Sequence, residues 1–225
     1  MRDLIKRYIV ATLGLAIVAL GVALSLKSNL GTSPVSCPPA FLNLGFRHIS
    51  VGTFTWMMHI VLILAQIMIL RRNFKLSFLM QIPAAFVFGY LCDLCIWLVD
   101  GIQVSTYLGQ MFLCLLTIVV TAIGIRLEVL GDVWMLAGEK TVVVLSEATK
   151  IRFSSMKIAV DLYMLIVAAI FGLIAFGSPF GDGHNVIIRE GTLILAILTG
   201  ACMHLTDPLV DKAVRKIYQK EPYII

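Results

Sequence analysis

The sequence predicts an all-α protein that crosses a membrane several times. Hydrophobic residues make up 60% of the 225 residues and charged residues only 14%, and the mean hydropathy is +0.96. An ordinary soluble domain has roughly 45–50% apolar and about 25% charged residues. This chain therefore has too few charges to cover a water-exposed surface. The same composition excludes a disordered, collagen-like or coiled-coil chain.

Six long apolar runs are candidates for membrane-spanning helices. Each has about 20 residues, which is the length that crosses ~30 Å of hydrocarbon. They are residues 8–26, 49–70, 76–99, 101–125, 158–181 and 191–210. The first run follows a basic segment and could be a signal peptide. It is longer than the apolar core of a usual signal peptide and has a counterpart in the second half, so we interpret it as a span.

Two further apolar segments, residues 34–46 and 133–145, are too short to cross a bilayer as helices. We expect them to form re-entrant or interfacial helices. Ser33 suits the N-cap position and Pro34 the first helical position of the first segment. Asp132 is expected to cap the second segment in the same way.

The basic residues predict the orientation. With the N-terminus inside, 15 of the 18 Lys and Arg residues lie on the inner side, and the other three are Lys27, Arg47 and Arg189. The positive-inside rule then places both termini, including the basic C-terminal tail, in the cytoplasm. The net charge of +5 is explained by an anionic lipid leaflet, and we expect no nucleic-acid partner.

The two halves of the chain resemble each other, within a single membrane domain. Residues 1–100 and 101–225 each contain one span, one short helix and two more spans. The pattern G-x3-D-L-x3-L-V-D at residues 89–100 aligns with G-x3-H-L-x3-L-V-D at residues 200–211. Because three crossings is an odd number, the second half enters the membrane from the opposite side. This predicts a 3+3 inverted-topology repeat, which many secondary transporters have.

Several short motifs also occur in the order of a known family. Gly31-Thr32-Ser33-Pro34 follows the first span, a short helix comes next, the second span ends in Arg71-Arg72, and Gly89 and Asp93 lie in the third. In these features the chain resembles the YczE/YyaS/YitT group of bacterial integral membrane proteins. The resemblance implies a multi-pass protein of the bacterial inner membrane. It implies little about the substrate and no catalytic residues.

Four ionisable residues interrupt the spans: His59, Asp93, Asp161 and His204. A charge at the bilayer centre costs at least ~2.5–3.5 kcal/mol, so each needs a reason. The repeat relates position 59 to 161 and position 93 to 204. We expect His59 to pair with Asp93, and Asp161 with His204. Such a pair either locks two helices together or binds a proton, since histidine titrates near neutral pH.

The predicted function is a small secondary transporter or permease for a polar or zwitterionic molecule, with proton coupling left open. Inverted repeats tend to bind substrate where the halves meet. We therefore expect a cavity near the midplane, lined by Asn29, Thr32 and Ser33 from the first half and by Asp132 and Glu139 from the second.

Two other functions stay open: a substrate-binding subunit of an ATP-driven vitamin uptake complex, and a membrane regulator or scaffold. The first needs an ATPase partner, and a homodimer is also left open. The five cysteines and four histidines have no zinc-site spacing. Catalytic motifs such as G-x-S-x-G or H-E-x-x-H and a nucleotide loop are absent from the sequence. We therefore expect no enzyme, no metal and no cofactor; the expected partners are the lipid bilayer and an unknown small molecule.

Overall fold

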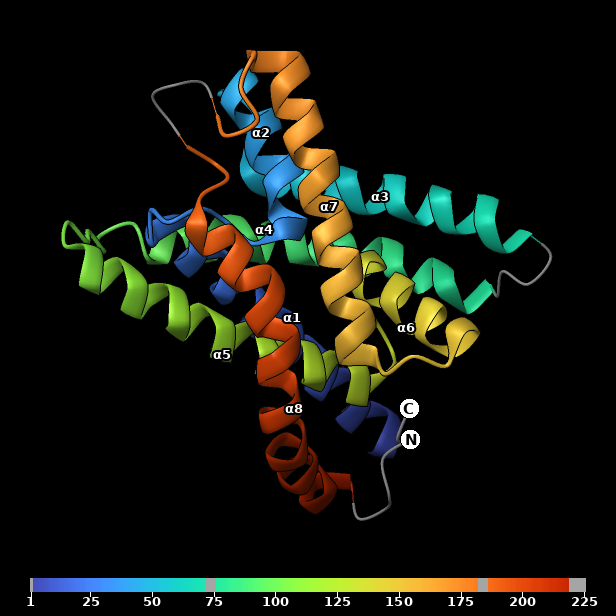
Figure 1. The fold of residues 1–225 in the computed structure, drawn as a ribbon. Coiled ribbons are helices and arrows are strands. Elements are labelled where there is room, and N and C mark those ends of the chain that lie inside the picture. The colour runs from blue at the N-terminus through green and yellow to red at the C-terminus, as the bar shows by residue number, and fades with distance from the viewer. Residues whose placement is uncertain (1, 72–75, 182–185, 219–225) are drawn as a thin grey trace.

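The computed structural model describes residues 2–71, 76–181 and 186–218, and these form a helical protein (Figure 1). In chain order the elements are α1 (Arg2–Lys27), the 3-10 helix η1 (Pro34–Ser36), α2 (Cys37–Gly45), α3 (Val51–Leu70), η3 (Leu76–Met80), α4 (Gln81–Leu98), α5 (Tyr107–Gly131), α6 (Ala137–Thr149), α7 (Phe153–Phe176) and α8 (Glu190–Tyr218).

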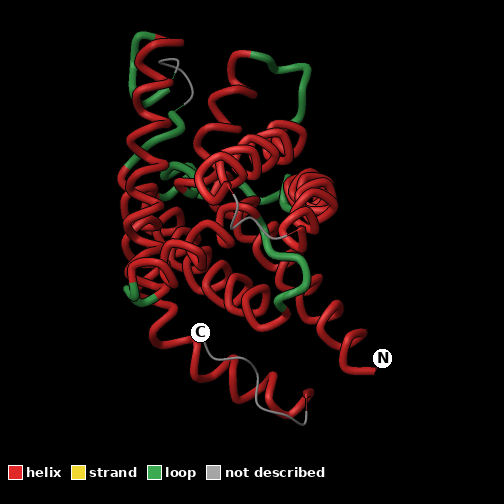
Figure 2. The backbone as a smooth tube through the Cα atoms, turned by 90° about the vertical axis from the view of Figure 1, so that its right-hand side faces the viewer, coloured by secondary structure: helices red, strands yellow, loops and turns green. Residues whose placement is uncertain are grey.

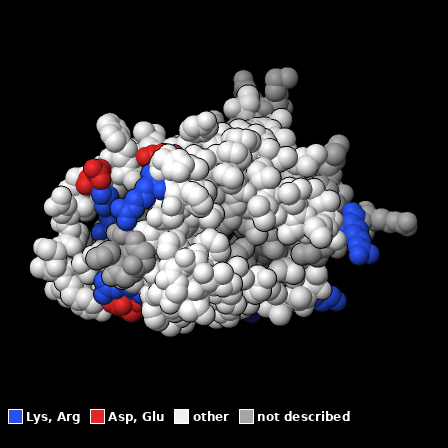
Figure 3. Space-filling view, turned by 90° about the horizontal axis from the view of Figure 1, so that it is seen from above, with Lys and Arg blue, Asp and Glu red and all other residues white. Residues whose placement is uncertain are grey.

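Six helices in the described ranges are long and apolar enough to cross a membrane, namely α1, α3, α4, α5, α7 and α8. The multi-pass architecture predicted from the sequence is confirmed at this level. The start of α1 and the end of α8 lie toward the same end of the molecule (Figures 1 and 2). On the face seen in Figure 3, charged side chains gather toward two ends and the broad stretch between them carries none. That uncharged stretch suits contact with lipid tails.

Both predicted short segments are helical, and the second has different bounds. The first begins at Pro34 as expected, after Ser33, whose side chain makes no capping hydrogen bond. The second begins at Ala137, with Leu136 as its N-cap. Asp132 instead ends α5 as a left-handed C-cap, so its predicted capping role is wrong. The start of this short helix was predicted too early because α5 does not end with the uncharged run at residue 125. The helix continues for six more residues, to Gly131.

Helices α1 and α5 form the closely packed centre of the fold. A Cβ atom on Gly14 would lie 2.9 Å from the carbonyl oxygen of Gly124, and one on Gly131 would lie 2.7 Å from the Cβ of Ala11. Early residues of α1 thus meet late residues of α5, so the helices run antiparallel. Small residues let two membrane helices approach backbone to backbone. Around them lies a core of buried residues that includes Phe88 of α4.

The remaining long helices form two pairs on this centre. Helix α3 packs on α4, and α7 packs on α8; α4 also contacts α1, and α8 also contacts α5. In Figure 1, α3 and α4 run crosswise to α7 and α8. Each short helix, α2 and α6, contacts both α3 and α7. The 3-10 helix η1, which leads directly into α2, meets the first turn of α6, because a Cβ on Gly138 would lie 3.7 Å from Cγ1 of Val35. The fold thereby brings the starts of both short helices to one central point.

Candidate functional site

A small cavity, here called the central cavity, lies where the starts of η1 and α6 meet the long helices. Its volume for the centres of water-sized spheres is about 30 Å³, which is room for one or two water molecules. The side chains around it come from both halves of the chain. They are Val18, Val22, Ser33, Val35, Ser36, Thr55, His59, Phe88, Thr121, Ile125, Leu136, Glu139 and Lys157.

The central cavity contains a buried ionic cluster built on Lys157 of α7. Its Nζ donates a hydrogen bond to Oδ1 of Asp161, 2.7 Å away and one turn later on the same helix. The same nitrogen lies 3.7 Å from Oε1 of Glu139 on α6, and all three side chains are at most 5% exposed. A buried charge is tolerated when it is paired. The cluster therefore joins α6 to α7 inside the protein.

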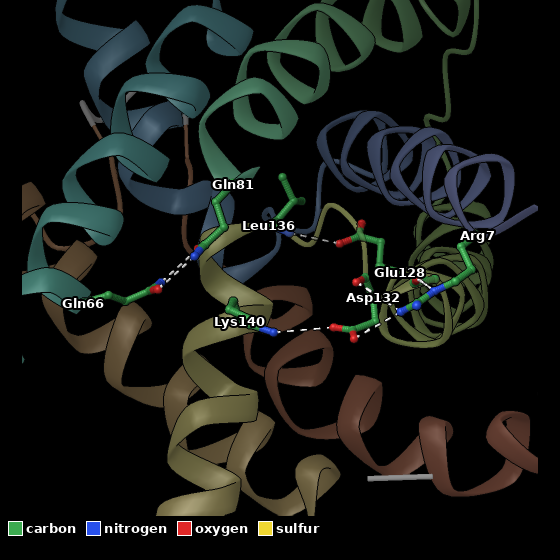
Figure 4. A network of polar contacts seen from close by, with 8 residues as sticks. Arg7, Gln66, Gln81, Glu128, Asp132, Leu136 and Lys140 are labelled. Carbon is green, nitrogen blue, oxygen red and sulfur yellow. Dashed lines mark hydrogen bonds and ion pairs between the residues drawn. The ribbon is translucent and has the colours of Figure 1, made fainter. Parts of the chain in front are cut away.

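A third carboxyl group, that of Glu128 on α5, lies close to this cluster. Glu128 is fully buried, and the backbone N–H of Leu136 donates to its Oε2 at 3.4 Å (Figure 4). Within the described part of the chain, Oε1 of Glu128 and Oε2 of Glu139 have no hydrogen-bond partner. Glu128 interacts electrostatically with Glu139 and Lys157, so three carboxyl groups share one nearby ammonium group, and two of their oxygens have no hydrogen-bond partner among the described residues.

His59 reaches the central cavity from α3. It is 1% exposed, and its ring packs edge-on against Phe88 with the centroids 5.7 Å apart. Neither ring nitrogen has a hydrogen-bond partner among the described residues. A buried polar group without a partner is costly. Each nitrogen is therefore available to a ligand or a water molecule, one as a hydrogen-bond donor and the other as an acceptor.

The predicted pair of His59 and Asp93 is not formed. Asp93 instead accepts hydrogen bonds from the Ser50 hydroxyl at 2.7 Å and from the backbone N–H of Gly52 at 2.9 Å. These groups belong to the first turn of α3, where N–H groups are free and the helix dipole attracts a carboxylate. Asp93 and His59 lie at similar predicted depths, but the direction in which each side chain points cannot be predicted from the sequence.

The predicted pair of Asp161 and His204 is not formed either. Asp161 is bound to Lys157, and His204 lies 2.7 Å from the hydroxyl of Ser154 through its Nε2. Ser154 is in the first turn of α7, as Gly52 is in the first turn of α3. His204 therefore ties α8 to the start of α7.

Of the five residues predicted to bind substrate, Ser33 and Glu139 line the central cavity. Asn29 and Thr32 do not. The carbonyl of Asn29 accepts a hydrogen bond from Arg189 at 2.8 Å, and the hydroxyl of Thr32 lies 3.1 Å from that of Ser25. Both residues hold the loop after α1, rather than facing the space between the halves.

Asp132, the fifth predicted residue, lies in a separate pocket near the start of α1. Its carboxylate forms ion pairs with Arg7 at 3.3 Å and Lys140 at 3.6 Å (Figure 4). This pocket, here called the vestibule, has a volume of about 460 Å³. Met135 lines the vestibule and Leu136 lines the central cavity. The segment between α5 and α6 therefore separates the two spaces.

A pair of amides holds the start of α6 beside the vestibule. Gln66 of α3 and Gln81 of α4 donate to each other at 3.2 and 3.1 Å, and Gln66 also donates to the carbonyl of Ala137 at 2.9 Å (Figure 4). Gln81 lines the vestibule. The first turn of α6 is thus attached to the first half of the chain.

Two residues of the cluster were not singled out from the sequence. Lys157 was counted among the cytoplasmic basic residues, and Glu128 was placed beyond the end of its span. The signal for Lys157 was its spacing of four from Asp161, which puts both on one helix face. For Glu128 the signal was the run Val129-Leu130-Gly131 after it, which continues the apolar helix.

Comparisons with known proteins identify relatives without a known activity. Residues 5–208 match the family described as "Family of unknown function (DUF6198)". The chain is 25% identical over 208 residues to "Uncharacterized protein YyaS" of Bacillus subtilis (strain 168), which covers 92% of this chain and 94% of that protein. No solved structure matches the chain. The resemblance to YyaS-like proteins predicted from the sequence is confirmed.

Proposed function

We propose that the chain, which belongs to the DUF6198 family of unknown function, is a secondary transporter of the bacterial inner membrane. In this proposal both termini are cytoplasmic, and a small polar or zwitterionic solute crosses through the central cavity. The observation that carries it is the central cavity itself. It holds a charged cluster in an otherwise apolar helix bundle, and intramembrane charges that face an internal cavity are a feature of transport pathways.

An inverted repeat is part of this proposal, and contacts between helices support it. A Cβ atom on Gly89 would lie 2.7 Å from the carbonyl oxygen of Gly52, and one on Gly200 would lie 2.7 Å from that of Ser154. These glycines are the aligned first letters of the sequence pattern. Gly52 and Ser154 both stand at the second position of their helices, α3 and α7. Equivalent residues thus make equivalent contacts in the two halves.

The polar contacts follow the same relation. Asp93 binds the backbone N–H of Gly52, and His204 binds the side chain of Ser154. Asp93 and His204 are also aligned by the sequence pattern. This shared role of Asp93 and His204 supports the repeat, although their partners differ from the ones expected. Both ties hold the last helix of a half to the first turn of the helix before it.

The two short helices supply the central elements of a transport site. The 3-10 helix η1 meets the first turn of α6 at Val35 and Gly138, which lie at equivalent places in the two halves. Inverted-repeat transporters commonly bind solute where interrupted helices expose free backbone groups. In the described structure the central cavity is too small for a metabolite, and Leu136 closes it toward the vestibule. The structure therefore fits an occluded state that opens by movement of the segment between α5 and α6.

Solute uptake into liposomes tests this proposal. Purified protein is first screened with amino acids, betaines and amines for those that raise its thermal stability, and the hits are then tested for gradient-driven uptake. We expect Glu139→Gln to lower uptake at least about tenfold, the effect of about 1.4 kcal/mol of lost stabilisation. Glu147→Gln is the matched control, because Glu147 lies on the same helix and is exposed.

Two results would overturn the proposal. The first is full uptake by the Glu139→Gln protein. The second is the absence of uptake of every stabilising solute under proton and sodium gradients. Stable co-purification with an ATPase, together with ATP-dependent uptake, would replace it by the binding-subunit alternative.

A further inference from the structure

We propose that Glu139 and His59 bind one exchangeable proton in the central cavity, through a water molecule that both contact. Both side chains line the cavity, one from each half of the chain. Its volume of about 30 Å³ admits such a water molecule but no larger ligand. The claim that this proton drives transport rests on the proposed function. The claim that the cavity binds a proton does not depend on it.

Glu139 is the carboxyl group in the cluster with the fewest hydrogen bonds. Its Oε2 has no partner among the described residues, and its Oε1 lies 3.7 Å from the Lys157 ammonium, beyond hydrogen-bond distance. Asp161 accepts a hydrogen bond from Lys157 at 2.7 Å, and Glu128 accepts one from a backbone N–H. A buried carboxylate without hydrogen bonds is costly, and of the three carboxyl groups only that of Glu139 lines the central cavity, so a water molecule in the cavity can reach it.

The groups on all surrounding elements leave the cluster short of positive charge, because one ammonium group lies among three carboxyl groups. Helix α5 contributes Glu128, and α7 contributes Lys157 and Asp161. Helix α1 presents Val18 and Val22, and α4 presents Phe88, which carry no charge. Cys37 of α2 lies near Asp161 as a thiol that is neutral at pH 7. Lys157 compensates one of the three carboxylates, and a proton on Glu139 compensates a second.

His59 gives the water molecule its second contact. With both ring nitrogens unpartnered, the neutral imidazole can accept a hydrogen bond on one nitrogen and donate from the other. A water molecule between the ring and Oε2 of Glu139 would satisfy both groups at once, and it would carry the proton to and from Glu139.

Binding of the proton also has a structural consequence. The Lys157–Glu139 contact joins α6 to α7, and a neutral Glu139 loses its attraction to the ammonium. Lys157 keeps its hydrogen bond to Asp161 on its own helix. Protonation would therefore loosen the start of α6, next to Leu136, which closes the cavity toward the vestibule.

Infrared difference spectroscopy of the purified protein at two pH values tests the site without any solute. We expect a C=O band of a protonated carboxylic acid that titrates with pH and is lost in Glu139→Gln. Glu139→Asp should keep a band at a shifted frequency, which separates loss of the acid from loss of the fold. His59→Gln should shift the pH at which the band appears. The controls Glu147→Gln and His48→Gln, both at exposed positions, should leave the spectrum unchanged.

The proton site is ruled out if the wild-type protein has no titrating carboxylic-acid band, or if the band persists in Glu139→Gln. The measurement also separates the two proposals. A titrating Glu139 band in a protein that transports no solute would leave the proton site and remove the transporter. Solute uptake by a protein without a titrating carboxylic-acid band would keep the transporter and remove the proton site.

Discussion

The ammonium nitrogen of Lys157 lies 3.7 Å from a carboxylate oxygen of Glu139, and both side chains are buried where the two short helices meet. One partner comes from the short helix α6 and the other from the long helix α7. This contact links the packing of the fold to the chemistry of the central cavity. Removing either charge is therefore expected to change both the stability and the transport properties.

Lys157→Met should be strongly destabilising. It leaves Asp161 and Glu139 as buried carboxylates without a cation, and breaking a buried ion pair on one side costs about 3–5 kcal/mol. Adding Asp161→Asn should recover part of the loss, because one uncompensated charge is removed. Denaturation in detergent measures both. Arg152→Met, an exposed change at the start of the same helix, should alter stability by less than about 0.5 kcal/mol. A double variant less stable than Lys157→Met alone would contradict the ionic role.

Gly89→Ala should separate α3 from α4. The added Cβ would lie 2.7 Å from the carbonyl oxygen of Gly52, and backbone at this distance cannot move aside without shifting the helix. Overpacking of this kind costs about 1–3 kcal/mol. Gly101→Ala is the control, since no atom lies within 4 Å of its added Cβ. Equal melting temperatures for the two variants would show that the helices are not packed this closely.

The contact between Lys27 and Asp100 should make a pH-dependent contribution to stability. Lys27 donates to Asp100 at 2.6 Å, and this hydrogen bond and the positive charge lower the pKa of the Asp100 carboxyl. A lowered folded-state pKa gives stability that is fully present above the unfolded-state value and is lost as the pH falls through the folded-state value. Wild type should therefore exceed Asp100→Asn in melting temperature at neutral pH, and the difference should shrink in acid. A difference that is constant with pH would exclude the pair as its cause.

The orientation can be tested with two single cysteines. Ser105 lies in the loop between α4 and α5 and Thr149 at the end of α6, and both are exposed. A membrane-impermeant thiol reagent applied to intact cells should label Ser105→Cys and miss Thr149→Cys; inside-out vesicles should show the opposite. The native cysteines are buried or partly buried, and labelling of the wild-type protein measures their background reaction. The sequence also predicts that Gly183 lies outside and Gln219 in the cytoplasm, and both positions lie outside the described residues.

The spans could be predicted from the sequence because each depends on a local run of apolar residues. The same holds for the start of the first short helix at Pro34. The end of α5 could not be predicted by the same rule, since Arg126 lies inside the helix. Its guanidinium forms two hydrogen bonds to Asp211 of α8, at 2.7 and 2.8 Å. A charge that interrupts an apolar run is compatible with a continuing helix when a distant residue pairs with it.

The site was predicted less well, because it depends on which way side chains point. The sequence placed Glu139 and Ser33 at the meeting of the halves, and both line the central cavity. The pairing of His59 with Asp93 was predicted from the repeat, although Asp93 turns to the free N–H groups of α3. Lys157 was predicted to be cytoplasmic. The direction of each of these side chains depends on how its helix is rotated and on which distant residue it contacts. Neither can be predicted from a single sequence.

Access to Ser33 from the two sides of the membrane tests the central claim most directly. Ser33 lines the central cavity, and a transporter must expose its site to each side in turn. We predict that a small impermeant thiol reagent labels Ser33→Cys from the outside and from the inside, and that a transported solute slows both reactions. Ser105→Cys and Thr149→Cys should each react from one side. Labelling of Ser33→Cys from one side only, or from neither, under all solute and pH conditions would contradict transport through this cavity.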